Sequence, residues 1–230
     1  MTRVITILRE VSARARAEAD EFRREMSRRR TLVVNVLSSP GAGKTSLLAA
    51  TAVHWGAKRR MAVLVGDIAT DRDAQRLAPL APTVQLTTGG ACHLDLELVQ
   101  RGWEALPEGE VDFLFIENVG NLVCPSSHDL GEHLRVVVLS TTEGDDKPAK
   151  YPKAFRTSQA LVISKIDLLP HVPFSVRAAT DDARTIQPEL SVWPLSALHG
   201  VGIEDWCDYL DDQRNRIFGI HGRQAANIRS

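Results

Sequence analysis

Residues 38–45 read SSPGAGKT, and this short stretch decides the fold of the chain. It follows a run of β-branched and apolar residues at 31–37 and opens a pattern rich in leucine and alanine, so the order is strand, glycine loop, helix. Backbone N–H groups in such a loop can surround a phosphate, and the N-terminus of the helix adds partial positive charge. The stretch therefore predicts a phosphate-binding loop, with a plain glycine turn as the alternative.

Side chains at the end of this loop suit a nucleoside triphosphate and its metal ion. Lys44 is placed to reach the outer phosphates, and the Thr45 hydroxyl suits Mg²⁺. Ser38 stands where the pattern GxxxxGK[ST] has its first glycine, which is a departure from that pattern. The residues expected around the phosphates are Gly41, Ala42, Gly43, Lys44, Thr45 and Ser46.

The composition is that of an ordinary globular protein. The chain has 230 residues, of which 43% are hydrophobic and 25% charged, and its formal net charge is −1. This length suits one domain with a well-buried core, and the charge gives no reason to expect nucleic acid or a membrane surface. The apolar start at residues 4–8 ends too early for a signal peptide. With three cysteines and no disulfide framework, we expect a reduced, cytoplasmic protein in which Cys207 is a small buried hydrophobe.

Strands and helices alternate after the phosphate loop. Further strands are expected at residues 61–65, 83–86, 111–116, 134–141, 160–163 and 190–195, and helices at residues 95–103, 172–186 and 203–216. Apolar strands separated by helices are typical of a mostly parallel sheet covered on both faces. The sequence therefore predicts an α/β fold, a single nucleotide-binding domain at 31–216 with a doubly wound sheet.

The two ends of the chain differ from this domain. Residues 1–30 are expected to form an N-terminal helical extension, because the part from Val11 to Arg30 has no Pro or Gly and carries acid–base pairs at helical spacing. Its faces are expected to be solvated, with a partner-docking arm as the alternative. The polar residues 217–230 are expected to form a flexible tail.

Acidic residues stand at the ends of two expected strands, where doubly wound sheets bind their ligands. Asp67 and Glu117 are therefore candidate oxygen ligands of Mg²⁺. Asp71 and Asp73 are interpreted instead as acids at a helix N-terminus. Gly120 is placed to offer its amide to the γ-phosphate, so the loop that it lies on is expected to move with the state of the nucleotide.

The last two expected strands end in residues that suit guanine. Asp167 can accept hydrogen bonds from guanine N1 and N2, which adenine does not offer. With Ser164 and Lys165 it resembles the NKxD motif of GTPases, in which asparagine stands at the serine position; serine is shorter and lacks the amide, so weaker contacts to the base or the neighbouring loop are expected. Ser196 and Ala197 resemble the Ser-Ala-Lys loop that covers guanine in GTPases.

Cysteine and histidine gather in two loops. Cys92 and His93 lie together in a glycine-rich segment, and Cys124 lies on the loop after Glu117. Thiolates and imidazole suit Zn²⁺ or Ni²⁺ better than Mg²⁺. Three ligands leave the site incomplete, so a second subunit or water would close it. His128 would approach the same metal if its segment is helical, and an exposed histidine is the alternative.

Four stretches resemble the HypB family of GTPases, which assist nickel incorporation into hydrogenase and belong to the SIMIBI class of phosphate-loop GTPases. They are LSSPGAGKT at 37–45, TGGACHLD at 88–95, IENVGNLVCP at 116–125 and TEGDDKPAKYP at 142–152. The resemblance covers residues from about 31 to 212. It makes Ser38 the family's own form of the loop.

The resemblance implies a GTPase that helps insert nickel into [NiFe] hydrogenase and forms a GTP-promoted homodimer. It implies a HypA-type nickel metallochaperone and the hydrogenase large-subunit precursor as partners, and neither nucleic acid nor membrane. Cys92, His93 and Cys124 would bind Ni²⁺ or Zn²⁺ near the dimer interface. Residues 1–30 contain neither Cys nor His, so the N-terminal nickel-binding motifs of some members are not expected.

The expected reaction is slow hydrolysis of GTP, with Lys44, Thr45, Asp67 and Glu117 organising phosphates and Mg²⁺. The sequence identifies no general base and no arginine finger. Two other functions are compatible with it: an accessory GTPase for another nickel enzyme such as urease, and a metal reservoir. The urease GTPases carry a Cys-Pro-His motif, which this chain lacks, and the absence of a histidine-rich tract speaks against a reservoir.

Overall fold

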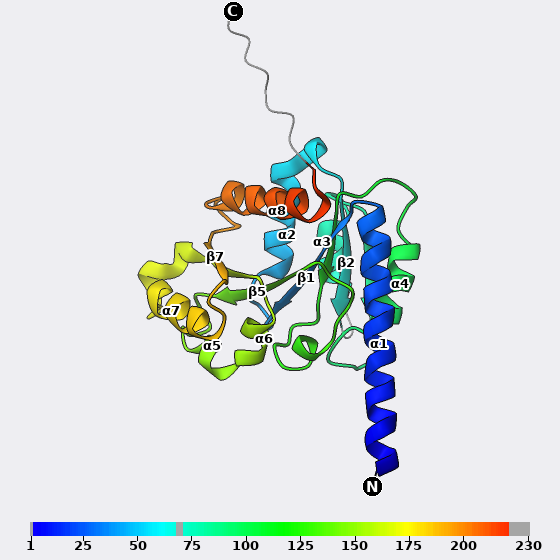
Figure 1. The fold of residues 1–230 in the computed structure, drawn as a ribbon. Coiled ribbons are helices and arrows are strands. Elements are labelled where there is room, and N and C mark those ends of the chain that lie inside the picture. The colour runs from blue at the N-terminus through cyan, green and yellow to red at the C-terminus, as the bar shows by residue number, and fades with distance from the viewer. Residues whose placement is uncertain (1, 68–70, 221–230) are drawn as a thin grey trace, which may run out of the picture.

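The computed structural model describes residues 2–67 and 71–220, with side chains described from residue 13 onward. Its centre is a seven-stranded sheet of order β3-β2-β4-β1-β5-β6-β7, in which every pairing is parallel (Figure 1). The strands are β1 (Leu32–Ser38), β2 (Met61–Asp67), β3 (Thr83–Thr87), β4 (Phe113–Glu117), β5 (Leu134–Ser140), β6 (Ala160–Ser164) and β7 (Ser191–Pro194). The predicted α/β fold with a parallel sheet is confirmed.

Helices cover both faces of this sheet, as the alternation of elements predicts. The α-helices are α1 (Thr2–Arg28), α2 (Lys44–Trp55), α3 (Arg72–Leu77), α4 (Leu96–Glu104), α5 (Lys147–Lys150), α6 (Pro152–Arg156), α7 (Val176–Ile186) and α8 (Ile203–Phe218). Short 3-10 helices are η1 (Gly56–Lys58), η2 (Pro125–Ser127) and η3 (Ile166–His171). The short helices α5 and α6 were not predicted, because each is at most five residues long and shows no hydrophobic period.

Alternate residues of β1 enter different cores. Val34 and Val36 belong to a cluster with α2 and α8, which includes the buried Trp206. Val33 belongs to a cluster on the opposite face with α1 and α4, and Leu37 to a cluster on that face with α6 and α7. Because side chains of a strand point alternately to its two faces, this division shows that the sheet is doubly wound.

Helix α1 spans Thr2–Arg28, within the helical extension expected at residues 1–30. Its second half is packed on the domain, with Ala19, Phe22 and Met26 all buried. The expectation of a helix solvated on all faces is therefore wrong for this half. The predicted ion pairs at helical spacing are present on its outer side, for example Arg14 Nε to Glu18 Oε1 at 2.9 Å.

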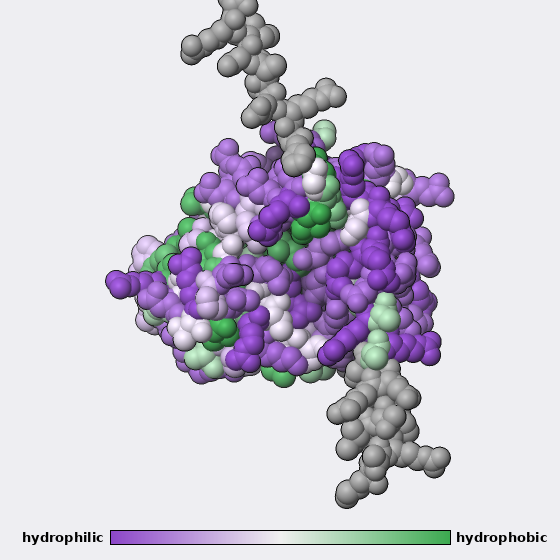
Figure 2. All heavy atoms as spheres, viewed as in Figure 1, coloured by the Kyte–Doolittle hydropathy of each residue, from purple (hydrophilic) through white to green (hydrophobic). Residues whose placement is uncertain are grey.

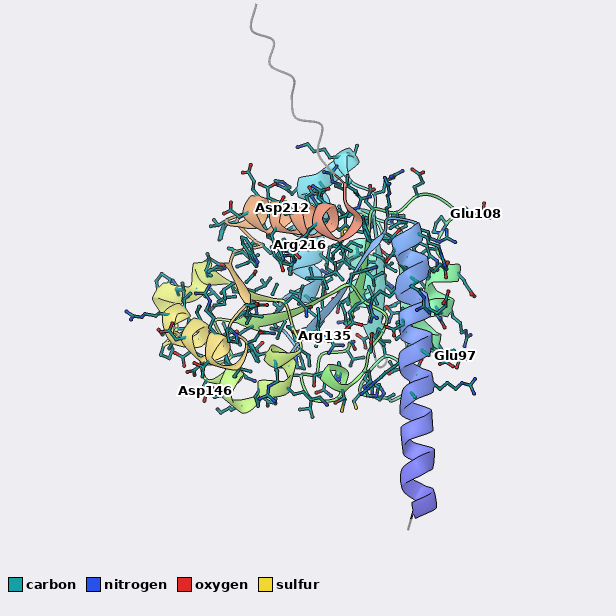
Figure 3. The ribbon with its side chains drawn as sticks, in the orientation of Figure 1. Glu97, Glu108, Arg135, Asp146, Asp212 and Arg216 are labelled. Carbon is teal, nitrogen blue, oxygen red and sulfur yellow. The ribbon has the colours of Figure 1, made fainter. Side chains whose placement is uncertain are left out.

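The surface agrees with this arrangement. In the view of Figure 2, hydrophilic residues dominate the side that carries α1, and hydrophobic residues are scattered over the other half. Most charged side chains lie at the periphery, but Arg135 lies inside the fold (Figure 3) and is only 8% exposed. No helix among the described residues has the length and apolar character that a membrane span requires.

Of the predicted tail, α8 includes Ile217 and Phe218, and residues 221–230 lie outside the described part.

Candidate functional site

The loop between β1 and α2 has the backbone of a phosphate cradle. Gly41 and Gly43 have φ angles of 75° and 95°, which side-chain-bearing residues rarely adopt. The N-terminus of α2 follows directly at Lys44, so its unpaired N–H groups face the same space. This geometry is what an anion of the size of a phosphate requires.

The side chain of Ser38, the first residue of the loop, holds Lys44 inside the loop. Lys44 Nζ donates to Ser38 Oγ at 2.9 Å, and the Ser38 hydroxyl in turn donates to the carbonyl of Ser39 at 2.6 Å. Burial lowers the pKa of Lys44, and the carboxylate of Glu117 opposes that effect. The serine at the glycine position therefore places the amine, a contact that the loop pattern alone did not predict.

Thr45 and Glu117 meet at the floor of the same site. The Thr45 hydroxyl donates to Glu117 Oε1 at 2.8 Å, and Glu117 is 3% exposed. Burial raises the pKa of Glu117 to about 7, although Lys44 and Thr45 favour its charged form. The second carboxylate oxygen, Oε2, is buried without a hydrogen-bond partner in the described part of the chain. An enclosed, unpaired carboxylate oxygen beside a hydroxyl fits a divalent cation such as Mg²⁺.

Lys44 and Glu117 line one cavity of about 260 Å³ at the carboxyl edge of the sheet. Asp67 lies at the end of β2 and contributes to its wall. Asp71 and Asp73 stand at the N-terminus of α3, as predicted, and Asp71 accepts a hydrogen bond from Gln75 at 2.8 Å. Asp73 also lines the cavity, so it is a candidate ligand that sequence reasoning set aside.

Gly120 brings the loop after β4 against the phosphate loop. A Cβ atom at Gly120 would lie 3.1 Å from the Cα of Pro40, so only glycine fits there without displacing backbone. The two loops therefore touch, and Gly120 lines the cavity that Lys44 and Glu117 share.

The strand end predicted to read guanine is joined to the same loop. Ser164 Oγ donates to the Ala42 carbonyl at 2.6 Å, and Lys165 Nζ donates to the Gly41 carbonyl at 2.7 Å. Lys165 has a φ of 59°, in the left-handed region, which turns the chain sharply after β6. In this structure the shorter serine does reach the neighbouring loop, contrary to the expectation of a weak contact there.

Asp167 and Ser196 lie together beyond β6 and β7. The Ser196 hydroxyl lowers the pKa of Asp167 by a hydrogen bond, and Asp167 Oδ1 is enclosed with no hydrogen-bond partner among the described residues. Ser196 itself is buried, and Ala197 beside it is half-buried. An unpaired carboxylate oxygen at this place suits a ligand that donates hydrogen bonds.

Glu143 is a further group that sequence reasoning missed. It follows β5, and burial raises its pKa, while Ser39 and Lys147 favour its charged form. Both of its carboxylate oxygens are buried without a hydrogen-bond partner in the described residues. Lys147 Nζ lies 3.5 Å from Ser39 Oγ, so an acid and an amine flank the start of the phosphate loop.

The predicted thiol and imidazole ligands lie on two loops that meet beside this cavity. Cys92 and Cys124 are neighbours, and the thiol of Cys124 raises the pKa of Cys92. The Cys92 Sγ lies 3.8 Å from Nδ1 of His93. Asn121 ties the two loops together, because its amide donates to the Cys92 carbonyl at 3.4 Å.

The donors are neighbours but are not arranged around one point. Within residues whose side chains are described, no three His, Cys, Asp or Glu groups are placed so that they could hold a metal ion. Binding at this place therefore requires side chains to turn. Cys207, by contrast, is 1% exposed in the core, as predicted for a small hydrophobe.

His128 is not the exposed histidine that the sequence favoured. It is half-buried, and its ring stacks on that of His93 with the centroids 3.8 Å apart and the planes inclined by 14°. Its Nδ1 lies 3.0 Å from the Cys124 carbonyl oxygen. The 3-10 helix η2 between Cys124 and His128 makes the turn that brings them together.

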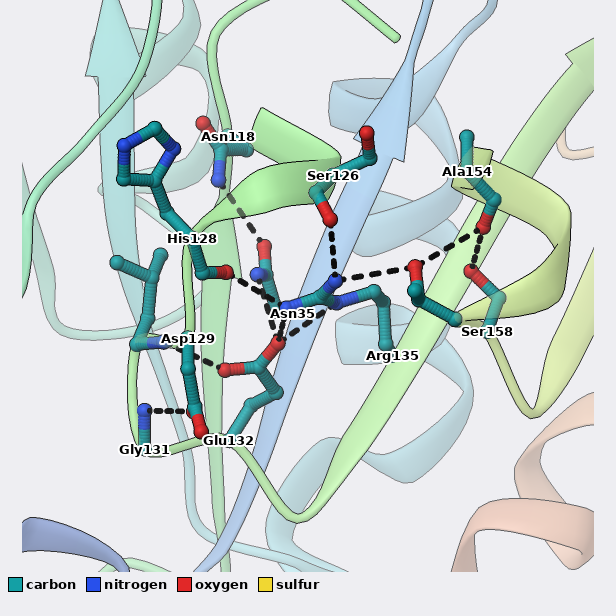
Figure 4. Close-up of polar contacts among 12 residues, drawn as sticks. Asn35, Asn118, Ser126, His128, Asp129, Gly131, Glu132, Arg135, Ala154 and Ser158 are labelled. Atoms are coloured by element: carbon teal, nitrogen blue, oxygen red, sulfur yellow. Dashed lines mark hydrogen bonds and ion pairs between the residues drawn. The ribbon is translucent and has the colours of Figure 1, made fainter. Parts of the chain in front are cut away.

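A buried polar network lies behind these loops (Figure 4). Asn35, in the centre of β1, accepts from Asn118 Nδ2 and donates to Glu132 Oε1, each at 3.2 Å. Glu132 forms an ion pair with Arg135, whose guanidinium also donates to the carbonyls of Ser126 at 3.2 Å and His128 at 2.7 Å. The network joins Asn118, beside Glu117, to the segment between Cys124 and His128. An asparagine inside an apolar strand was the available sequence signal for it.

The chain is similar in sequence to known proteins. The family model "CobW/HypB/UreG, nucleotide-binding domain" matches residues 32–194. The hydrogenase maturation factor HypB of Azotobacter chroococcum mcd 1 is 42% identical over 214 residues, which are 93% of this chain and 70% of that protein. The hydrogenase/urease maturation factor HypB of Helicobacter pylori J99 is 37% identical, covering 93% of this chain and 90% of the relative.

A solved structure has the same fold. HypB from Helicobacter pylori, determined in complex with nickel, superposes with a TM-score of 0.85 at 35% identity. The match covers 89% of this chain and 97% of that one, so the similarity extends well beyond the phosphate loop.

Proposed function

Because the chain belongs to the HypB family of hydrogenase maturation factors, we propose that it is a GTP-hydrolysing metallochaperone that assists nickel insertion into [NiFe] hydrogenase. One observation carries this proposal. The phosphate loop with Lys44 and Thr45, and the adjacent thiols of Cys92 and Cys124, lie at the same carboxyl edge of the sheet. A nucleotide and a soft metal ion would therefore bind on neighbouring loops of one domain.

The triphosphate binds in the 38–45 loop, where backbone N–H groups and the N-terminus of α2 offset its charge. Lys44, fixed by Ser38, stabilises the negative charge that develops on the phosphates. Mg²⁺ would be held by Thr45 and Glu117, with Asp67 directly or through water, and would supply charge neutralisation between the outer phosphates. The unpaired Oε2 of Glu117 supports this assignment.

Guanine is the base that fits the far end of the site. The enclosed Oδ1 of Asp167 accepts from guanine N1 and N2, while the Ser196–Ala197 segment covers the ring. Lys165 bonds to the phosphate loop and so joins base recognition to phosphate binding. Hydrolysis follows from positioning and charge stabilisation, and intrinsic turnover is slow because no arginine side chain of the described residues lines the phosphate cavity.

Nickel is the cargo of this protein, bound by Cys92, His93 and Cys124. Two thiolates and an imidazole form a soft donor set that suits Ni²⁺ or Zn²⁺. Gly120 and Cys124 lie on one loop, so a γ-phosphate contact at Gly120 repositions one side of the metal site. GTP-promoted dimerisation, a HypA-type metallochaperone that supplies nickel, and the hydrogenase large-subunit precursor that receives it complete the proposed cycle.

Two variants test the proposal together. Lys44→Ala removes the amine from the phosphate loop, so it abolishes GTP hydrolysis while nickel binding without nucleotide remains. Cys124→Ala does the reverse, weakening nickel binding while basal GTP turnover survives. Normal hydrolysis in the first variant contradicts the nucleotide assignment, and unchanged nickel affinity in the second contradicts the ligand assignment.

Delivery to urease is a second candidate function, since two Helicobacter relatives carry the name hydrogenase/urease maturation factor. A host lacking the gene for this chain, complemented with it, separates the two. Recovery of hydrogenase activity alone supports hydrogenase as the recipient, and recovery of urease activity supports the alternative.

A further inference from the structure

We propose that His128 is a fourth ligand of the nickel site, so that one chain supplies two thiolates and two imidazoles. This inference rests on the proposed function, in which Cys92, His93 and Cys124 bind the metal. It adds one histidine of the same chain to the three donors named from the sequence.

The position of the ring is the first support. His128 and His93 stack with centroids 3.8 Å apart, and His93 Nδ1 lies 3.8 Å from Cys92 Sγ. The loop of Cys92 is tied to that of Cys124 by Asn121, whose amide donates to the Cys92 carbonyl at 3.4 Å. All four side chains therefore meet in one patch formed by the loop after β3 and the loop after β4.

The hydrogen bonding of His128 leaves the correct nitrogen for a metal. A carbonyl oxygen only accepts, so Nδ1, which lies 3.0 Å from the Cys124 oxygen, carries the proton. In this tautomer Nε2 holds a lone pair, and it has no hydrogen-bond partner among the described side chains and backbone groups. Metal-binding histidines are typically oriented in this way, with the second nitrogen bonded to a carbonyl or carboxylate.

The backbone of His128 is fixed from behind. Arg135 donates to the carbonyls of Ser126 and His128, at 3.2 Å and 2.7 Å, and is itself held by the buried carboxylate of Glu132. The main chain between Cys124 and His128 is thus anchored while the imidazole faces His93. A fixed backbone limits the positions that the imidazole can reach and keeps it beside the other donors.

The stack itself is not the coordinating arrangement. Two nearly parallel rings direct their lone pairs side by side, so one ring must turn about its side-chain bonds for both nitrogens to reach one ion. This agrees with the absence of a converged group of three donors within the described residues. Two sulfurs and two nitrogens would be a donor set that suits Ni²⁺ or Zn²⁺.

Nickel titration of three forms of the full chain tests this assignment: the unaltered protein, His128→Phe and His171→Phe. Phenylalanine keeps an aromatic ring for stacking on His93 but removes the nitrogen. His171 is an exposed histidine on η3 and serves as the matched control. Affinity is measured by chelator competition under reducing conditions, stoichiometry by mass spectrometry, and the number of bound imidazoles by X-ray absorption.

We expect one Ni²⁺ per chain in the unaltered protein and in the control. His128→Phe should lower nickel affinity at least about tenfold and remove one nitrogen from the metal. Wild-type affinity in His128→Phe or an unchanged nitrogen count would each overturn the assignment. Failure of the unaltered protein to bind nickel would instead reject the metal role in the proposed function.

Discussion

At the scale of single residues, the site depends on polar atoms that lack partners inside the protein. Glu117 Oε2 and Asp167 Oδ1 are both enclosed without hydrogen bonds from described residues. Leaving such atoms unpaired costs free energy, so the fold retains them where a ligand can satisfy them. They mark the two ends of the proposed nucleotide site, the metal end and the base end.

The base end gives a prediction about specificity. Asp167→Asn replaces an acceptor by a group that also donates, which opposes the N2 amino group of guanine and suits the C2 carbonyl of xanthine. We expect GTP binding to weaken about a hundredfold, corresponding to ~3 kcal/mol from two hydrogen bonds to a charged group. XTP binding should improve, as measured by competition between the two nucleotides. Equal loss of both would show that Asp167 is structural.

A second residue-scale prediction concerns acid stability. Burial lowers the pKa of His133 to about 4, and nearby Arg23 adds to that effect. The neutral ring accepts from Val33 N–H at 3.0 Å and contacts Ser27 Oγ at 2.9 Å. Above pH 6.5 the ring is neutral in both folded and unfolded chains, so its contribution is fully present. As the pH falls from 6.5 to 4, only the unfolded chain binds the proton, and up to about 3 kcal/mol is lost.

His133→Asn tests this effect, because its amide oxygen can still accept from Val33 while nothing titrates. Urea unfolding between pH 4 and 7 should show a smaller loss of stability in the variant than in the unaltered protein. Parallel pH profiles would contradict the assignment to His133.

At the scale of elements, α1 is part of the domain and not an appendage. Phe22 is 2% exposed and packs in the cluster that contains Val33 of β1. Gly131 makes room for it, since a Cβ there would approach Phe22 Cδ1 to 2.7 Å. Arg23 adds a hydrogen bond to the carbonyl of Glu132 at 2.9 Å. The helix thus covers the same segment that carries the buried Glu132–Arg135 pair.

Truncating this contact should destabilise the whole domain. We expect Phe22→Ala to lower the free energy of unfolding by about 3–5 kcal/mol, because it leaves a cavity in a packed core. Arg14→Ala on the exposed side of the same helix is the control, since its ion pair with Glu18 is worth at most about 1 kcal/mol. The urea concentration at the midpoint of unfolding reports the stability of both variants. If the Phe22→Ala protein is as stable as the control, the packing of α1 on the domain is contradicted and the solvated helix that the sequence suggested is supported.

The sequence predicted elements better than it predicted contacts between them. All seven strands and the long helices follow from apolar runs and periodicity. Residues after most strand ends could be named as ligands because parallel strands present them at one edge, but Glu143 after β5 was missed. Three features could not be predicted: the burial of Phe22, the Ser38–Lys44 bond and the Asn35–Glu132–Arg135 network. Each depends on how the folded chain brings side chains together, which no periodic pattern in the sequence shows. The loop geometry around His128 is of the same kind, because a short 3-10 turn has no period.

At the scale of the whole molecule, the proposed nucleotide and metal sites share one loop between β4 and β5. The loop contacts Pro40 through Gly120 and carries Cys124, and Asn118 within it connects to Glu132 and Arg135. If both ligands bind, any effect of the nucleotide on nickel affinity must be matched by an equal effect of nickel on nucleotide affinity.

This reciprocity is measurable. We expect nickel affinity to differ between the forms bound to a GTP analogue and to GDP, by the 5- to 150-fold that is typical of coupled sites, at roughly 1–3 kcal/mol. Competition titrations of nickel against each form, and of each nucleotide with and without nickel, should give the same ratio. Equal nickel affinities in the two forms would remove the coupling while leaving both sites in place.

The order of the strands also has a consequence for how the chain folds. Strand β1 pairs only with β4 and β5 in the described sheet, and its partner residues run from Phe113 to Val138. During synthesis the phosphate-loop strand must therefore wait until β4, which begins at Phe113, has been made before it finds a neighbour, whereas β2 and β3 can pair earlier. Such distant pairing slows folding and leaves an apolar strand exposed in the meantime. The strand that leads into the phosphate loop is thus the first strand to be made, but it gains both neighbours only after β5 has been made.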